Sequence, residues 1–275
     1  MNKHNNRALT VVLRERAATA NSSTTTASEE TNTTDTFECF TSRDQLRQAV
    51  VEYTSTNQTE SNAAYVTYGN ISEWCVTPVN DMYAVFANLP PTFNHNLGKW
   101  DVSNVKNMSF MFDSAFSFTG EDLNQWDVGN VIDMRGMFAD TCCAFNADLS
   151  KWNTSNVQNM SQMFENAQKF NQDVSMWDIS SVKNMSKMFL GAQQFNQDLC
   201  AWGGGGGATN SGVFPYSAVT DIFRDTACKF EDSPVEGRKG PFCASLCDLP
   251  SSSSMRHLAP ISLVLSSLIS FTLGR

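Results

Sequence analysis

Residues 152–177 read WNTSNVQNMSQMFENAQKFNQDVSMW, and this stretch decides the fold. It runs from one tryptophan to the next, and the six tryptophans of the 275-residue chain follow one another at intervals of 26, 26, 26, 25 and 25 residues: Trp74, Trp100, Trp126, Trp152, Trp177 and Trp202. Self-similarity at a fixed period of this size is typical of repeat architectures. Because a repeat array offers an extended surface more often than a catalytic pocket, a binding function is the first expectation.

The apolar residues of each repeat occupy the same positions after the tryptophan. In the quoted stretch they are Val157, Met160, the pair Met163-Phe164, and Phe170. A single repeat cannot bury these side chains, whereas stacked repeats bury them in continuous columns. We therefore interpret the periodic methionines and phenylalanines as core packing, and not as a cofactor site or a promiscuous binding surface.

The path of one repeat can also be predicted. Residues 149–154 suit a short strand, and residues 157–160 suit an extended or turning segment. Residues 163–167 have apolar residues at helical spacing and suit one or two helical turns. The predicted fold class is an α/β repeat of about six to seven turns with capped ends, each turn 25–26 residues long.

The quoted stretch resembles the 26-residue repeat of bacterial surface lipoproteins, which belongs with the BspA-like leucine-rich-repeat surface proteins. The resemblance covers the chain from Cys39 to Cys243. It implies a right-handed leucine-rich-repeat-like solenoid on a cell surface, with adhesion or protein binding as its role. It carries over no catalytic residue.

Two polar columns accompany the apolar ones. They are an aspartate four residues before the tryptophan and an asparagine after the second phenylalanine: Asp122, Asp148, Asp173 and Asp198, then Asn94, Asn146, Asn171 and Asn196. We expect the asparagines to hydrogen-bond the loop backbone of the neighbouring turn. A metal-binding carboxylate ladder is the weaker interpretation, because its ligands would come one per turn. The corresponding enzyme hypothesis is a glycosidase-like carboxylate pair formed by Asp148 and Asp173.

The N-terminal part of the chain divides into three segments. Residues 1–36 are rich in Ser, Thr and Asn and are expected to be disordered. Residues 37–73 form a predicted cap of one helix over residues 43–53, with Ser42 as its N-cap, and one strand over residues 65–71. Residues 74–202 are the repeats.

The C-terminal part has two segments. Residues 203–247 hold a glycine run and a degenerate last turn, in which Val219, Ile222 and Phe223 continue the apolar columns, followed by a Cys-bearing cap. Residues 248–275 combine a polar spacer with an apolar tail.

The eight cysteines are expected to form disulfides at the ends of the array. Cys39 and Cys75 bracket the N-terminal cap, and Cys228 and Cys243 bracket a loop near the other end, so we predict these two pairs. The adjacent cysteines at 142 and 143 are not expected to pair with each other. No two cysteines have the spacing of a structural zinc site, and the histidines are scattered, so we predict no metal and no cofactor.

Several signals point to the cell surface. The glycosylation candidates outside the repeats are Asn21, Asn32 and Asn57. The candidate attachment sites for a glycolipid (GPI) anchor, ahead of the apolar run at residues 258–273, are Ser251, Ser252 and Ser253. The apolar run at residues 8–13 is shorter than that of a signal peptide. We expect a surface protein anchored at its C-terminus, and a weakly membrane-associated tail on an intracellular protein is the alternative.

The residues just before the tryptophans vary, and they form the predicted contact column: Lys99, Gln125, Lys151 and Met176. Ordinary solvent-facing residues are the alternative interpretation. The net charge of −9 and the lack of a basic stripe argue against a nucleic-acid partner. The predicted function is non-catalytic adhesion, or recognition of a protein or glycan, at the cell surface. The alternatives are a structural cell-wall or matrix spacer and a carbohydrate-active enzyme.

Overall fold

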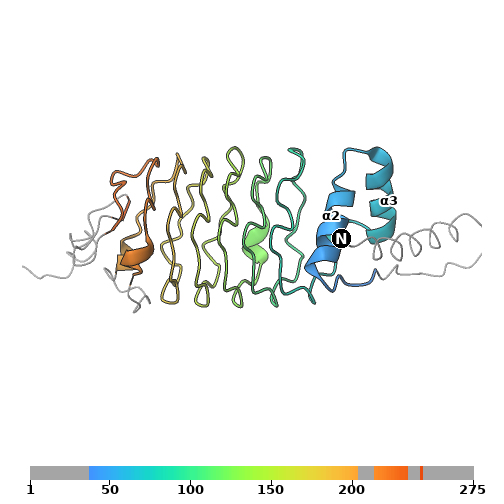
Figure 1. The fold of residues 1–275 in the computed structure, drawn as a ribbon, viewed down its shortest axis with the longest axis horizontal. Helices are drawn as coiled ribbons and strands as arrows, with labels where there is room; N and C mark the ends of the chain where they lie inside the picture. The colour runs from blue at the N-terminus through green and yellow to red at the C-terminus, as the bar shows by residue number, and fades with distance from the viewer. Residues whose placement is uncertain (1–36, 204–213, 235–241, 244–275) are drawn as a thin grey trace, which may run out of the picture.

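The computed structural model describes residues 37–203, 214–234 and 242–243. Figure 1 shows the repeats as coil turns side by side along the long axis, with two helices at one end. The helical elements in chain order are α2 (Arg43–Tyr53), α3 (Gln58–Tyr68) and the 3-10 segments η1 (Ile71–Glu73), η2 (Leu123–Gln125), η3 (Cys200–Gly203) and η4 (Tyr216–Ala218). We call the array of coil turns the stack.

The predicted α/β class is wrong. In the described part of the chain the repeats contain no β-strand, and neighbouring turns meet through single parallel bridges: Asp81 with Asn107, Asn107 with Asp133, Asp133 with Asn159, and Asn159 with Asn184. A leucine-rich-repeat-like solenoid with a strand in every turn is therefore not what forms. The repeats are irregular coils instead.

Backbone conformation explains why residues 157–167 and their counterparts in other repeats form neither a strand nor an α-helical turn. In the third repeat, the N–H groups of Met134, Gly136 and Phe138 donate to the next turn. Met137 and Ala139, which follow Gly136 and Phe138, donate three residues back within their own turn. Two residues in this part of each repeat have positive φ. In the third repeat they are Gly136 and Asp140, with φ 57° and 54°. Left-handed residues at this spacing interrupt both a strand and a helix.

The core consists of the predicted columns. The valines, methionines and phenylalanines of these columns are buried, and one ring column runs through the stack from Phe86 to Phe223. Centroids of neighbouring rings in this column lie 5.0–6.0 Å apart. Each tryptophan in the middle of the stack is hydrogen-bonded to an earlier turn. Trp126 Nε1, for example, donates to the Leu97 carbonyl oxygen at 2.9 Å. A buried indole N–H requires such an acceptor.

The N-terminal cap has two helices instead of a helix and a strand. Helix α2 begins as predicted, with the Ser42 hydroxyl accepting from the Gln45 N–H, and it buries Leu46, Ala49 and Val50. Helix α3 replaces the predicted strand. Its N-cap Asn57 accepts from the Thr59 N–H, and Gly69 follows its last residue with φ 71°. An Asn cap and a terminal glycine are helix signals, and they outweigh the apolar run that suggested a strand.

The C-terminal end continues the stack after the glycine run. The N–H groups of Met185, Lys187 and Phe189 donate to residues 218, 220 and 222, which makes these segments neighbours. Val219, Ile222 and Phe223 are buried in the expected columns.

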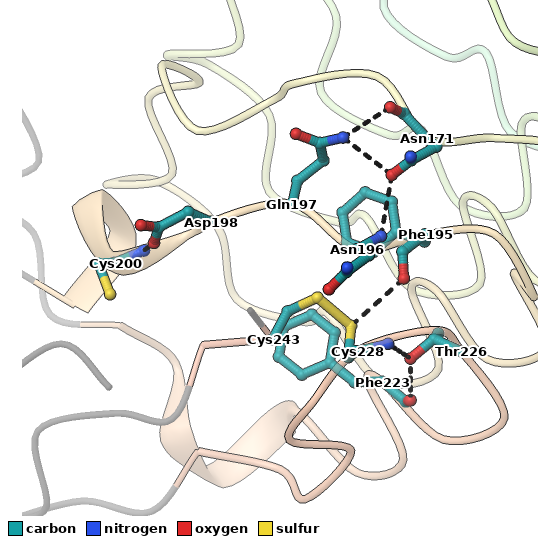
Figure 2. The surroundings of a disulfide bond; sticks show 10 residues. All are labelled: Asn171, Phe195, Asn196, Gln197, Asp198, Cys200, Phe223, Thr226, Cys228 and Cys243. Atoms are coloured by element: carbon teal, nitrogen blue, oxygen red, sulfur yellow. Dashed lines mark hydrogen bonds between the residues drawn. A yellow bond between two sulfur atoms is a disulfide. The ribbon is translucent and has the colours of Figure 1, made fainter. Parts of the chain in front are cut away.

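Disulfides lie at both ends and in one loop. The structure joins Cys39 to Cys75 and Cys228 to Cys243, the two predicted pairs. Figure 2 shows the second pair against the last full repeat, where Cys228 Sγ lies 3.6 Å from the Phe195 carbonyl oxygen. The expectation that residues 142 and 143 would not pair is wrong. They form a vicinal disulfide (Cys142–Cys143) in a loop that follows the positive-φ residue Asp140.

Candidate binding surface

The repeated Asp and Asn side chains cap the corners of the coil. In the fourth repeat, the Oδ1 atoms of Asn153 and Asn159 accept from the backbone N–H two residues later, and Asp148 does the same before the tryptophan. The same contact recurs in other repeats at Asp81, Asn96, Asp101, Asn107, Asp127, Asp133, Asp173, Asp178, Asn184 and Asp198. Short polar side chains that accept from a nearby N–H stabilise turns. The polar columns therefore have a structural role.

The proposed carboxylate pair fits this capping role better than an acid–base role. A general acid of a glycosidase needs a raised pKa. The backbone N–H and hydroxyl of Ser150 donate to Asp148 and lower the pKa of that carboxyl instead. The Asp173 Oδ1 atom accepts from the Ser175 N–H at 2.8 Å. In the described segments, no group of three His, Cys, Asp or Glu side chains is placed to hold a metal ion.

The asparagine column bonds neighbouring turns as predicted. The Oδ1 atoms of Asn146 and Asn171 accept from the backbone N–H of the asparagine one turn later, both at 2.9 Å. Figure 2 shows the last of these contacts, with Gln197 also donating to Asn171. Asn94 accepts in the same way from the Thr119 N–H. These amides hold the turns in register.

The predicted contact column lies on the surface. Lys99, Gln125, Lys151 and Met176 are all exposed, and Met176 is 70% exposed. Lys99 forms an ion pair with Glu73, with 2.5 Å between Nζ and Oε1. Gln125 donates to the neighbouring Asn124. The column is accessible, and its role in binding stays a prediction.

A second exposed feature was not foreseen from the sequence. It is a row of aromatic and guanidinium groups at one corner of successive turns, which we call the aromatic–arginine corner: Arg43, Tyr83, Phe110, Arg135 and Gln162. The Arg43 guanidinium lies over the Tyr83 ring, with 5.2 Å from Cζ to the centroid. The rings of Tyr83 and Phe110 meet edge to face at 6.2 Å. Arg135 lies over Phe110 at 5.2 Å, and its Nε donates to Gln162.

Phe110 has an unusual backbone for an aromatic residue. Its φ is 55°, in the left-handed region that bulky residues rarely occupy. The same position of the next repeat is Gly136, and a Cβ there would lie 2.4 Å from the Phe110 ring. The ring therefore fits over a glycine in the adjacent turn. The left-handed conformation itself recurs at this position of other turns, as at Ala84, Gln162 and Lys187, so it is a property of the coil.

Some predicted sites can be placed and others cannot. Asn57 is exposed at the start of α3, with its side chain engaged in the helix cap. Asn21, Asn32 and the anchor candidates Ser251, Ser252 and Ser253 lie outside the described residues. Across the segments that the structure describes, none of the helices has the length and apolarity required to cross a bilayer.

Comparison with known proteins gives a family and no function. No curated protein and no solved structure shows significant similarity to the chain. One family of proteins matches residues 54–142 and 117–216, which together cover more than half of the sequence. Its description does not mention the BspA-like proteins, so that resemblance stays a prediction. The chain belongs to the family described as Mycoplasma protein of unknown function, DUF285.

Proposed function

We propose that this protein is a non-catalytic cell-surface protein that binds a protein or glycan partner along the side of its stack. The aromatic–arginine corner is the observation that carries the proposal. Tyr83 is 43% exposed although it is a large aromatic residue. Aromatic and arginine side chains are enriched in binding interfaces, and they dominate the hot spots of these interfaces.

The arrangement of polar groups supports binding over catalysis. The Asp and Asn side chains that repeat along the stack accept hydrogen bonds from their own turns, so they serve the backbone. Exposed side chains differ between repeats. Tyr83 and Arg135 are exposed at a position that is serine in other repeats, where Ser109 and Ser161 are buried. A repeated coil that carries different exposed side chains in successive turns offers an extended surface of the kind that repeat proteins use for binding.

A structural spacer in a cell wall or matrix is the second candidate. It is favoured by the continuous ring column and by the amide contacts that join successive turns. Surface display, with a C-terminal anchor in residues 248–275, belongs to both proposals. Disulfides at both ends support an oxidising compartment, because disulfides persist there.

Bead attachment tests the binding proposal. The full chain is coupled to beads, and attachment is measured to cells that produce the protein and to beads that carry a second copy. One variant combines Tyr83→Ser, Phe110→Gly and Arg135→Ser. These changes use residues that the same positions carry in other repeats, so the coil is expected to fold.

A matched variant changes the predicted contact column with Lys99→Ser, Gln125→Ser and Lys151→Ser. Binding at the corner requires that only the first variant lose attachment. If only the matched variant loses attachment, the site is the column before the tryptophans. If the wild-type chain attaches to neither target, the spacer role is the better account.

A further inference from the structure

Positive charge gathers at the aromatic–arginine corner of an acidic protein. Four exposed cations flank the ladder of parallel bridges, at positions six, nine and ten residues after the tryptophan: Lys106, Arg135, Lys183 and Lys187. The two carboxylates of the same ladder are Asp81 and Asp133, whose Oδ1 atoms cap the backbone. Glu165, whose Oε2 accepts from Gln162 Nε2, is a third carboxylate at the corner. Four cations against three carboxylates leave a net charge of +1, whereas the whole chain carries −9.

These four cations have no ion pair among the described residues, and the same holds for Lys151, Lys169 and Lys229, whereas some other cations are paired. Lys99 pairs with Glu73, and Arg224 lies within ion-pair distance of Asp221 and Asp225. Within the described residues, no carboxylate pairs with Lys106, Arg135, Lys183 or Lys187. Unpaired exposed cations in an acidic protein leave a local positive potential that attracts acidic groups.

Arg135 is held in place without its charge being neutralised. The Phe110 ring lies under its guanidinium, and its Nε donates to Gln162 Oε1 at 3.1 Å. Its two Nη nitrogens have no hydrogen-bond partner among the described residues. A guanidinium with free Nη groups can bind a carboxylate through two parallel hydrogen bonds. Because the side chain is already ordered, less conformational entropy is lost on binding.

The ring geometry favours a polypeptide over a sugar chain. Stacking of sugars requires open ring faces, but guanidinium groups lie over Tyr83 and Phe110. The two rings also meet at 83°, so they do not form a flat platform. Backbone N–H groups at this corner are also already hydrogen-bonded, since those of Lys106 and Ile132 donate to the preceding turn. Recognition therefore depends on side chains and not on strand addition.

We propose that the aromatic–arginine corner, together with Lys106, Lys183 and Lys187, binds an acidic segment of a protein partner that lies along the stack. The carboxylates of that segment bind the guanidinium of Arg135 and the lysines, and its apolar groups contact the edges of Tyr83 and Phe110. This inference rests on the proposed binding function and adds the class of partner.

Binding of two carboxylate polymers to the full chain tests the inference. The probes are fluorescent poly-L-glutamate and polygalacturonate, titrated by anisotropy at low salt and again at high salt. The test variant combines Arg135→Glu and Lys187→Glu. The control combines Lys169→Glu and Lys229→Glu, which change the net charge equally at exposed positions outside the corner and outside the contact column. Circular dichroism and Tm check the fold, and Arg135→Ser replaces the test variant if it does not fold.

The inference requires that poly-L-glutamate bind and that salt weaken the binding. The test variant should then weaken it about tenfold or more, and the control less than about twofold. Phe110→Gly retains every charge but removes the ring under Arg135, so a smaller loss of about threefold is expected.

Three results would overturn the inference. Equal losses in the test variant and the control would mean that only net charge matters. Binding of polygalacturonate without poly-L-glutamate would replace the protein partner with a glycan, and it would leave the binding function intact. If neither polymer binds at low salt, the acidic partner is wrong, whereas the bead assay still decides the binding function separately.

Discussion

Replacing Phe164 with alanine is the sharpest test of how the stack is held together. The ring is fully buried, and it lies between the rings of Phe138 and Phe189 in the column that joins successive turns, at centroid distances of 5.7 and 5.5 Å. Within its own turn it stacks on Phe170 at 3.9 Å. Loss of this side chain removes contacts with both neighbouring turns at once.

The expected cost follows from the burial and the ring pairs. Truncating a buried phenylalanine to alanine destabilises proteins by about 3–5 kcal/mol. Each aromatic pair adds about 0.5–1.5 kcal/mol beyond burial, and Phe164 has four stacked partners. These pairs place Phe164 at the upper end of the range for truncation. We therefore expect Phe164→Ala to lower the free energy of unfolding by about 5 kcal/mol.

Denaturant unfolding of the full chain with intact disulfides measures this cost. Phe164→Leu is the matched control, since it keeps most of the apolar volume and should cost about 1–2 kcal/mol. The m-value of both variants should match that of the wild type if only the stability changes. A cost below about 2 kcal/mol for Phe164→Ala, or equal costs for both variants, would refute the view that the ring column holds the turns together.

Three further changes test other parts of the structure. The disulfide between Cys39 and Cys75 closes a 36-residue separation, so replacing both cysteines with serine should cost about 4 kcal/mol in denaturant unfolding, whereas removal of the vicinal disulfide should cost about 1 kcal/mol or less. A loss of equal size for the two disulfides would contradict this account. Burial, and then the nearby Asp140, raise the pKa of Asp113, so ionisation of that carboxyl destabilises the folded state above its unfolded pKa. Asp113→Asn should therefore raise the Tm near pH 7. At about pH 3 the carboxyl of Asp113 is protonated in both the folded and the unfolded state, so this gain should disappear. A change in Tm that does not depend on pH would contradict this explanation. Asn171 accepts from the backbone of the next turn, so Asn171→Ala should cost about 1–2 kcal/mol by calorimetry, and no measurable loss would show that the amide ladder does not set the register.

The candidate surface was predicted only in part. The contact column before the tryptophans is exposed, as its variable sequence suggested, because a varying residue beside a buried one faces solvent. The aromatic–arginine corner was missed because its members stand about one repeat apart in sequence. Tyr83 and Phe110 also hold different positions within their repeats. Contacts of this kind depend on the register between turns, which no single repeat contains.

One missed feature did have a local signal. The second positive-φ residue of each repeat stands fourteen residues after the tryptophan, and it is Asn88, Ser114, Asp140, Asn166 or Gly191. Small turn-forming residues at a fixed position argue against a helical turn there. The first positive-φ position has no such signal, since it includes Phe110. The strand and helix prediction failed because apolar spacing was given more weight than these turn residues.

The sequence by itself determined the number of turns, the buried columns, the degenerate last turn and the two disulfides at the ends. These follow from periodicity and from the rule that every turn must bury the same side chains against its neighbours. Only the tertiary structure decided the coil path, the second cap helix, the vicinal disulfide and the corner where arginines lie over aromatic rings. These depend on backbone conformation and on contacts between turns, and the inward-facing pattern of apolar residues does not encode either one.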